Sequence, residues 1–349
     1  MSQSVTVGDR AVGPGRRALL IAEVGLIHDG SLGTAHAYVD AVAAAGADAV
    51  KFQTHIATAE STFDEPFRTH FSQQDKSRFE YWERTAFTEP QWKDLAAHAR
   101  DRDLLFLSSA FSVAAVDLLT RVGVPAWKVG SGELRRLELL ATMGATELPV
   151  LLSTGMSSLD EIERGVEIVR AAGSEVALFQ STSRYPSSFE KIGLNVMAEL
   201  RSAYGVPVGL SDHSGTPWPA VAAMTLGAEM IEVHVTLDRR AFGPDVPASL
   251  TVDELRSLTL ARDAIHTMLT NPVDKNHEAV ELEPLRSMFT KSLALRTDLP
   301  AGTVLTADLL TQKKPGTGIG RDEIDRVVGR RLRRAVTSDR LLRWEDLDG

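Results

Sequence analysis

Residues 19–52 read LLIAEVGLIHDGSLGTAHAYVDAVAAAGADAVKF, and this stretch decides the fold. The run Leu19–Val24 is almost continuously apolar, as expected for a parallel strand that is covered on both faces. Gly33–Ala45 carries apolar residues at helical spacing, and Gly46 can take the left-handed backbone conformation that ends a helix. A second apolar run, Ala49–Phe52, follows. The stretch therefore predicts a strand–helix–strand unit with parallel strands.

The same alternation recurs along the chain. The predicted strands are Leu19–Val24, Ala49–Phe52, Leu104–Leu107, Ala126–Val129, Pro149–Leu152, Val176–Phe179, Val206–Leu210 and Met230–Val233. Further predicted helices are Glu89–Arg102, Val113–Val122, Leu159–Ala172, Leu194–Tyr204 and Pro219–Leu226. Eight such units over roughly 250 residues predict an α/β fold of the (β/α)8 TIM-barrel type. A doubly wound parallel sheet is the alternative, and eight consecutive units disfavour it.

The chain divides into four predicted regions. We expect an N-terminal extension over residues 1–17, the barrel over 18–270, a polar linker over 271–283 and a small β-rich domain over 284–349. The extension is either disordered or a short strand pair. The insertion Phe63–Arg84 is either a lid or subunit contact, or a surface excursion without function.

Composition excludes several classes of protein. The 349 residues are 43% hydrophobic and 24% charged, which is typical of a globular protein. The net charge of −9 argues against a nucleic-acid binder, and no apolar stretch reaches the roughly 18 residues of a membrane span. The absence of cysteine excludes disulfides and thiol chemistry and is compatible with a cytoplasmic location. The C-terminal domain is basic beside an acidic remainder, which favours contact between domains or subunits over RNA binding.

Polar side chains occupy the end of every predicted strand. Active sites of (β/α)8 barrels lie at the C-terminal ends of the strands. In strand order the residues there are Glu23; Lys51, Gln53, Thr54 and His55; Ser108 and Ser109; Lys128, Ser131 and Glu133; Ser153 and Thr154; Ser181, Thr182, Ser183, Arg184 and Tyr185; Ser211, Asp212 and His213; Glu232 and His234. So many polar groups on one rim predict an active site there.

The residue types at this rim indicate its chemistry. Lys51 and Lys128, with serine hydroxyls and glycine-flanked turns, would cradle a phosphate, although each lysine could instead form a salt bridge inside the barrel. No Walker loop or GxGxxG is present, so a small phosphorylated acid is favoured over a nucleotide. His213 and His234 end neighbouring strands and either bind one divalent metal or are merely hydrogen-bonded. Glu23 is either an acid/base or sugar ligand, or a partner for Lys51.

Several ordered motifs resemble the N-acetylneuraminate (sialic acid) synthase family. They are IAEVGLIHDGSLGTAHAYVDAVAAAGADAVKFQTH, KVGSGE, LLSTGMSSLDEI, STSRYPSSFEKIGLN, VGLSDHSG, IEVHVTLDR with GPDVPASL, and KKPGTGI. The resemblance runs from about Ala18 to the C-terminus. It implies a (β/α)8 barrel followed by an antifreeze-like (SAF) domain. It also implies a domain-swapped homodimer in which that domain covers the active site of the partner, which accounts for the basic C-terminal domain better than RNA does.

The resemblance also implies a reaction and its residues. Phosphoenolpyruvate would condense with open-chain N-acetylmannosamine or a related aldose, with water addition, C–O cleavage and release of phosphate, and with Mn²⁺ or Mg²⁺ polarising the aldehyde. The implied metal ligands are His213 and His234. The implied phosphoenolpyruvate contacts are Lys51, Ser109, Lys128, Ser131, Ser153, Ser183 and Ser211. Residues that would handle the sugar or the protons are Glu23, Gln53, Tyr185, Asp245 and, from the C-terminal domain, Lys314.

Two departures from the family pattern bear on the acceptor sugar. The chain has STSRYP where the family often has CTSEYP, so that Ser181 and Arg184 differ, and it has Lys314 where the family commonly has arginine. Lysine cannot reproduce the planar, two-pronged contact of a guanidinium. The acceptor could therefore be a legionaminic- or pseudaminic-type precursor, a non-acylated sugar or an intermediate of a specialised metabolite. A metal-dependent pyruvate aldolase and a non-catalytic binding protein are the remaining alternatives, and the lysine–serine set and the filled rim disfavour them.

Overall fold

The computed structural model describes residues 3–69 and 71–348. The chain divides into two compact units, residues 1–270 and 271–349, and each is described by itself.

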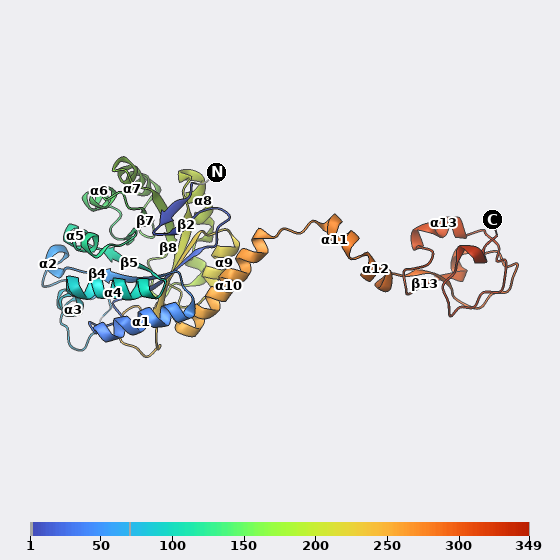
Figure 1. The fold of residues 1–349 in the computed structure, drawn as a ribbon, viewed down its shortest axis with the longest axis horizontal. Helices are drawn as coiled ribbons and strands as arrows, with labels where there is room; N and C mark the ends of the chain where they lie inside the picture. The colour runs from blue at the N-terminus through green and yellow to red at the C-terminus, as the bar shows by residue number, and fades with distance from the viewer. Residues whose placement is uncertain (1–2, 70, 349) are drawn as a thin grey trace. The chain divides into compact units, whose positions relative to one another are not determined.

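In the described part of the first unit, eight parallel strands close into a barrel (Figure 1). The eighth strand of the ring pairs with the seventh on one side and with the first on the other, which closes the sheet. The barrel strands are β3 (Leu19–Gly25), β4 (Ala49–Thr54), β5 (Leu105–Ala110), β6 (Trp127–Val129), β7 (Val150–Ser153), β8 (Val176–Ser181), β9 (Val208–Asp212) and β10 (Met230–Thr236). A further strand, β11 (Ser249–Thr251), pairs in parallel with β10. The predicted TIM barrel is confirmed.

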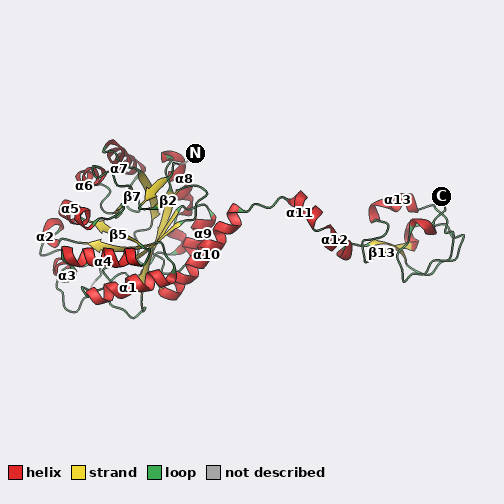
Figure 2. Cartoon of the chain, in the orientation of Figure 1, coloured by secondary structure: helices red, strands yellow, loops and turns green. Residues whose placement is uncertain are grey.

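Helices surround the strands of this unit (Figure 2). They are α1 (Leu32–Ala45), α4 (Glu89–Asp101), α5 (Val113–Val122), α6 (Leu137–Gly144), α7 (Leu159–Ala171), α8 (Leu194–Tyr204), α9 (Trp218–Thr225) and α10 (Val252–Thr270). Two shorter helices, α2 (Ala57–Glu60) and α3 (Arg78–Thr85), lie in or next to the insertion after β4. Gly46 ends α1 with a left-handed φ of 82°, as its position in the sequence predicts. No helix in residues 3–69 and 71–348 has the length and apolarity that crossing a bilayer requires.

The barrel interior is apolar at its N-terminal end. Side chains at alternate strand positions point to the same face, so Leu19 and Ile21 share the inward face with Glu23. Leu19 and Ile21 belong to an interior cluster that also holds Val5 and Val7. These valines come from a hairpin of β1 (Val5–Val7) and β2 (Arg10–Val12), whose strands pair antiparallel. Of the two alternatives for the N-terminal extension, the chain therefore forms the strand pair, and it covers the barrel floor.

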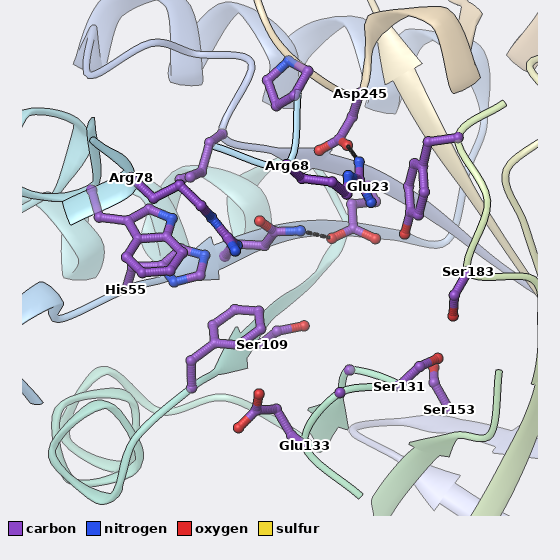
Figure 3. A pocket seen from close by; sticks show the side chains of 18 of the residues that line it. Glu23, His55, Arg68, Arg78, Ser109, Ser131, Glu133, Ser153, Ser183 and Asp245 are labelled. Carbon is purple, nitrogen blue, oxygen red and sulfur yellow. Dashed lines mark hydrogen bonds and ion pairs between the residues drawn. The ribbon is translucent and has the colours of Figure 1, made fainter. Parts of the chain in front are cut away.

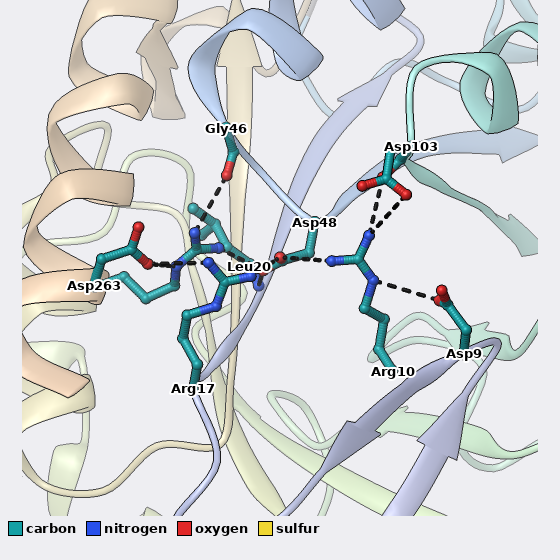
Figure 4. A network of polar contacts seen from close by, with 9 residues as sticks. Asp9, Arg10, Arg17, Leu20, Gly46, Asp48, Asp103 and Asp263 are labelled. Atoms are coloured by element: carbon teal, nitrogen blue, oxygen red, sulfur yellow. Dashed lines mark hydrogen bonds and ion pairs between the residues drawn. The ribbon is translucent and has the colours of Figure 1, made fainter. Parts of the chain in front are cut away.

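Asp48 is the centre of an ionic network at the same end (Figure 4). Its carboxylate is 4% exposed and accepts hydrogen bonds from the Leu20 amide at 2.8 Å and from Arg17 Nη2 at 2.8 Å. It also accepts from Arg10 Nη1 at 3.4 Å and from Arg262 on α10, which is itself 2% exposed. The network joins the hairpin, the first two barrel strands and the last helix of the barrel.

The second unit has a small core of its own. Its elements are α11 (Lys275–Glu281), α12 (Glu283–Phe289), β12 (Ser292–Leu295), β13 (Leu310–Lys313) and α13 (Ile324–Val327). β12 and β13 pair antiparallel, and Leu293, Leu305 and Val327 are among the buried residues of the core. The segment expected as a polar linker, residues 271–283, contains α11. Asp274 caps this helix by accepting from the amides of Asn276 and His277, which explains how so polar a segment is helical.

Asp346 makes the second unit acid-sensitive. Its fully buried carboxylate accepts from Arg334 Nε and Arg340 Nη1, both at 2.7 Å. Burial raises the pKa of Asp346, but the arginine hydrogen bonds outweigh it and lower the pKa from 3.8 to about 2. The folded-state pKa is below the unfolded one, so the stabilisation, about 2 kcal/mol, is complete above about pH 4 and is lost as the pH falls through 2.

We therefore expect Asp346→Asn to lower the free energy of unfolding of this unit by about 2 kcal/mol at pH 7. The difference between the variant and the unchanged chain should shrink as the pH falls from 4 to 2. Hydrogen exchange of peptides from residues 291–348 measures this unit within the full chain. A difference that stays constant over this pH range would contradict the assignment.

Candidate active site

A cavity of about 560 Å³ opens at the C-terminal ends of the barrel strands (Figure 3). Most of the site residues proposed from the sequence line it: Glu23, Lys51, Gln53, Ser109, Lys128, Ser131, Ser153, Ser183, Tyr185, Ser211, His213 and Asp245. His234 is not among the lining residues, but its ring centroid lies 5.4 Å from that of His213. Lys314 belongs to the second unit, where its Nζ lies 4.9 Å from the ring centre of Phe289.

Strand register brings the first group of charges together. Glu23 on β3 is in register with Lys51 on β4 and with His234 on β10. Lys51 Nζ lies 2.8 Å from Glu23 Oε1, and His234 Nε2 lies 3.6 Å from Glu23 Oε2. Gln53, two residues after Lys51 and hence on the same face of β4, donates to Glu23 Oε1 at 2.9 Å. The pairing of Glu23 with Lys51 is thus present, inside a cavity.

Glu232 is a charged residue whose role the sequence did not reveal. It lies between the two lysines: Lys128 Nζ is 3.0 Å from its Oε1, and Lys51 Nζ is 3.5 Å from its Oε2. Ser211 also donates to Oε1, at 2.9 Å. Glu232 precedes His234 by two residues on β10, so strand alternation places both on the inward face. This spacing is the feature of the sequence that could have identified Glu232 as a site residue.

These buried charges shift one another's pKa values. Burial raises the pKa of Glu23, but Lys51, His234 and Lys128 outweigh it and hold that pKa far below its usual range. Burial lowers the pKa of Lys51, but Glu23 and Glu232 outweigh it and raise that pKa. For Lys128 burial dominates, and its pKa is lowered. Glu23 is therefore an ionised carboxylate at neutral pH, next to two amines of unequal acidity.

Serine hydroxyls surround the lysines. Lys51 donates to Ser109 Oγ at 3.2 Å, and Lys128 donates to Ser153 Oγ at 2.7 Å. Beyond them Ser131 Oγ accepts from the Gly155 amide at 3.2 Å. A Cβ at Gly155 would lie 2.8 Å from Ser183 Oγ and 3.0 Å from Ser131 Oγ, so only glycine leaves this space open. Two cations, several hydroxyls and a glycine backbone that a ligand can approach closely are the elements of a cradle for an oxyanion.

The two histidines have the features of metal ligands. His213 Nδ1 donates to the Thr182 carbonyl at 2.6 Å, so Nε2 keeps its lone pair, and it accepts from the Tyr185 hydroxyl at 2.9 Å. Burial lowers the pKa of His213 to about 3, which keeps the ring neutral. Within residues 3–69 and 71–348, His234 Nδ1 is buried without a hydrogen-bond partner. No group of three histidine, aspartate or glutamate side chains in the described residues converges as a complete metal site.

The insertion supplies one wall of the cavity. Its lining residues are Glu65, Phe67, Arg68, Thr69, Phe71, Arg78, Tyr81 and Trp82. The guanidinium of Arg68 lies 4.5 Å from the ring centre of Tyr185, and its Nη2 lies 3.8 Å from Asp245 Oδ1. The sequence did not identify Arg68, because nothing in a polar insertion indicates which side chain returns to the barrel.

Comparisons with known proteins agree over nearly the whole chain. A family model described as NeuB family matches residues 38–274, and a SAF domain model matches residues 290–348. The chain is 30% identical to the N,N'-diacetyllegionaminic acid synthase of Campylobacter jejuni, over 94% of this chain and 99% of that protein. It is 30% identical to the human N-acetylneuraminate-9-phosphate synthase, over 97% and 95%. The crystal structure of an N-acetylneuraminic acid synthetase from Leptospira borgpetersenii matches with a TM-score of 0.72 and 29% identity, over 81% of this chain and 97% of that one.

Proposed function

The chain belongs to the NeuB family of sialic-acid-type synthases and carries a C-terminal SAF domain, and from this premise we propose that it condenses phosphoenolpyruvate with N-acetylmannosamine or a related aldose. The products would be a 2-keto-3-deoxy sugar acid and inorganic phosphate. One observation carries the proposal: Lys51 and Lys128, each hydrogen-bonded to a serine, share a cavity with the ionised Glu23 and with His213. A pyruvate aldolase would have no use for such a cradle.

The lysines and serines would bind the anionic substrate. Phosphoenolpyruvate brings a phosphate and a carboxylate, and Lys51 and Lys128 offset their charge in a site of low dielectric. The Ser109 and Ser153 hydroxyls, which accept from the lysines, can donate to the substrate, and the glycine at position 155 leaves room for it. The lysines are held by Glu23 and Glu232 before the substrate arrives, so their ammonium groups need little reorganisation.

Glu23 would handle the proton of the attacking water. In the described structure its basicity is suppressed, mainly by Lys51. Once a phosphate draws on the charge of Lys51, the pKa of Glu23 rises towards the range of a useful base. Gln53 Nε2 holds Glu23 Oε1 in place at 2.9 Å, which leaves Oε2 to face the reacting atoms.

His213 and His234 would hold a divalent cation, Mn²⁺ or Mg²⁺. The neutral His213 ring, the proximity of the two histidines and a His234 Nδ1 that has no hydrogen-bond partner among the described residues fit such an ion. When bound, the cation supplies a Lewis acid for the aldehyde oxygen of the acceptor. The Tyr185 hydroxyl, which donates to His213 in the described structure, would then be released toward the sugar.

We also propose a homodimer in which the SAF domain of one subunit reaches the cavity of the other, with Lys314 near the acceptor. Apolar side chains on α11 and α12 support it: Val280, Met288 and Phe289 are 73%, 64% and 60% exposed in the single chain. Such an apolar surface is typical of a subunit contact. Lys314 would contact the acceptor in this dimer. An assay with one acylated, one diacetamido and one non-acylated aldose therefore identifies the class of acceptor.

Phosphate release from phosphoenolpyruvate tests the proposal. We expect release with Mn²⁺ and at least one of N-acetylmannosamine, a 2,4-diacetamido hexose or a non-acylated aldose, and a loss of at least about 100-fold with a chelator. Aldol product formed from pyruvate, without release of phosphate, would instead support the aldolase. Chelator-insensitive release would reject the metal role of the histidines, and no release with any aldose would reject the proposed reaction.

A further inference from the structure

A stack of side chains lines the cavity on the side of Glu23 opposite Ser153 and Ser183. His55 lies between Trp82 and Phe111, with ring centroids 4.4 Å and 4.1 Å away and interplanar angles of 9° and 10°. Arg78 extends the stack, with its guanidinium 4.5 Å from the Trp82 ring centre. Aromatic rings on both faces hold the imidazole in one plane, so only its edge can interact with a ligand.

Glu60 determines which ring nitrogen of His55 is left to interact with a ligand. Glu60 Oε2 lies 3.1 Å from His55 Nδ1, and a carboxylate can only accept, so Nδ1 carries the hydrogen. Among the described residues the other carboxylate oxygen, Oε1, is buried without a partner, so the hydrogen bond to Glu60 comes from the Nδ1–H of His55. In the neutral ring Nε2 is then a hydrogen-bond acceptor. Across residues 3–69 and 71–348 no donor is bonded to this atom, although His55 lines the cavity.

The location of His55 matches the far part of an acceptor chain. His55 follows β4 and comes two residues after Gln53, which holds Glu23. In Figure 3, Ser153 and Ser183 lie on one side of Glu23 and His55 lies on the other. With phosphoenolpyruvate at Ser153 and Ser183 and the new bond formed near Glu23, the remaining carbons of the aldose would extend towards His55. The hydroxyl and amide N–H groups on those carbons are hydrogen-bond donors.

We propose that His55 is a positioning residue for the acceptor, whose Nε2 accepts a hydrogen bond from a hydroxyl or amide N–H on a carbon remote from the aldehyde. The role rests on the proposed function. Glu60 sets the tautomer, and the Trp82–Phe111 clamp removes the rotational freedom that an unclamped side chain would lose on binding. A phosphate at Nε2 is disfavoured, because it would present acceptors to an acceptor atom.

His55→Phe keeps an aromatic ring in the clamp and removes the acceptor atom. We expect the acceptor KM to rise about 5- to 30-fold, with kcat changed less than about threefold and the phosphoenolpyruvate KM less than about twofold. His55→Gln, whose amide oxygen can approach the position of Nε2, should recover part of the loss. His266→Phe on α10, outside this cavity, is the matched control.

A series of aldose analogues, each lacking one hydroxyl or one amide, locates the group that donates to His55 Nε2. For one analogue the unchanged chain and His55→Phe should have equal KM values; a difference that persists for every analogue overturns the proposal. Equal losses for both substrates, together with a lower melting temperature, would mean a structural role and also overturn it. Calorimetric titration of aldose separates the two proposals: binding that depends on His55 without any phosphate release keeps the role of His55 and rejects the reaction, and no binding to the unchanged chain rejects both.

Discussion

Glu23→Gln should lower kcat for phosphate release by about 10³-fold while leaving phosphoenolpyruvate binding intact or tighter. Glutamine preserves the shape of the side chain, but it cannot take a proton. The substitution also removes the carboxylate that lies 2.8 Å from Lys51 Nζ, so the ammonium can turn fully to the anionic substrate. Lys51 keeps Glu232 as a counter-charge at 3.5 Å, which protects the fold.

Single-turnover kinetics and calorimetric titration with phosphoenolpyruvate distinguish the expected outcome from others. The same substitution at the exposed Glu199 on α8 controls for loss of a charge. A fall of less than about tenfold in kcat would show that another group or a water handles the proton. A parallel loss of substrate affinity and of melting temperature would instead show that Glu23 serves to hold the lysines.

The barrel was predictable because its signal is local and repeated. Each strand is a short apolar run, several helices end in a glycine such as Gly46, and a sequence of eight units leaves few topologies. Helix α6 (Leu137–Gly144) was not predicted from LELLATMG, since its eight residues are too few to show a clear helical period. The N-terminal hairpin had a signal, VTV and RAV around Gly8, which takes a φ of 63° in the turn.

The candidate site was partly predictable, for a different reason. Strand ends face the active site in this fold, so polar residues there could be collected without knowing any contact. The role of Glu232 is different, because it depends on reaching both Lys51 and Lys128, on strands far apart in the sequence. The stack of His55 on Trp82 and Phe111 likewise joins the residue after β4, helix α3 and the residue after β5. Such long-range contacts leave no periodic trace in the sequence.

The Asp48 carboxylate should contribute more to the stability of the fold than any other carboxylate of the barrel floor. Asp48→Asn keeps the size of the side chain but leaves Arg262, which is 2% exposed, without its buried counter-charge. Removing one partner of a buried ion pair costs about 3–5 kcal/mol, because the other charge stays desolvated. Arg10 and Arg17 are partly exposed and can turn to water, so they add little to this cost.

Urea unfolding of the variant, followed by far-UV circular dichroism, measures the loss. Asp263→Asn is the matched control: it removes another carboxylate bonded to Arg17 and Arg262, but the side chain is 47% exposed, so the expected cost is below about 1 kcal/mol. Adding Arg262→Met to Asp48→Asn should recover part of the stability, because no buried charge then lacks a partner. Equal effects of the two single substitutions, or no recovery in the double variant, would show that the desolvated charge of Arg262 is not what makes Asp48 necessary.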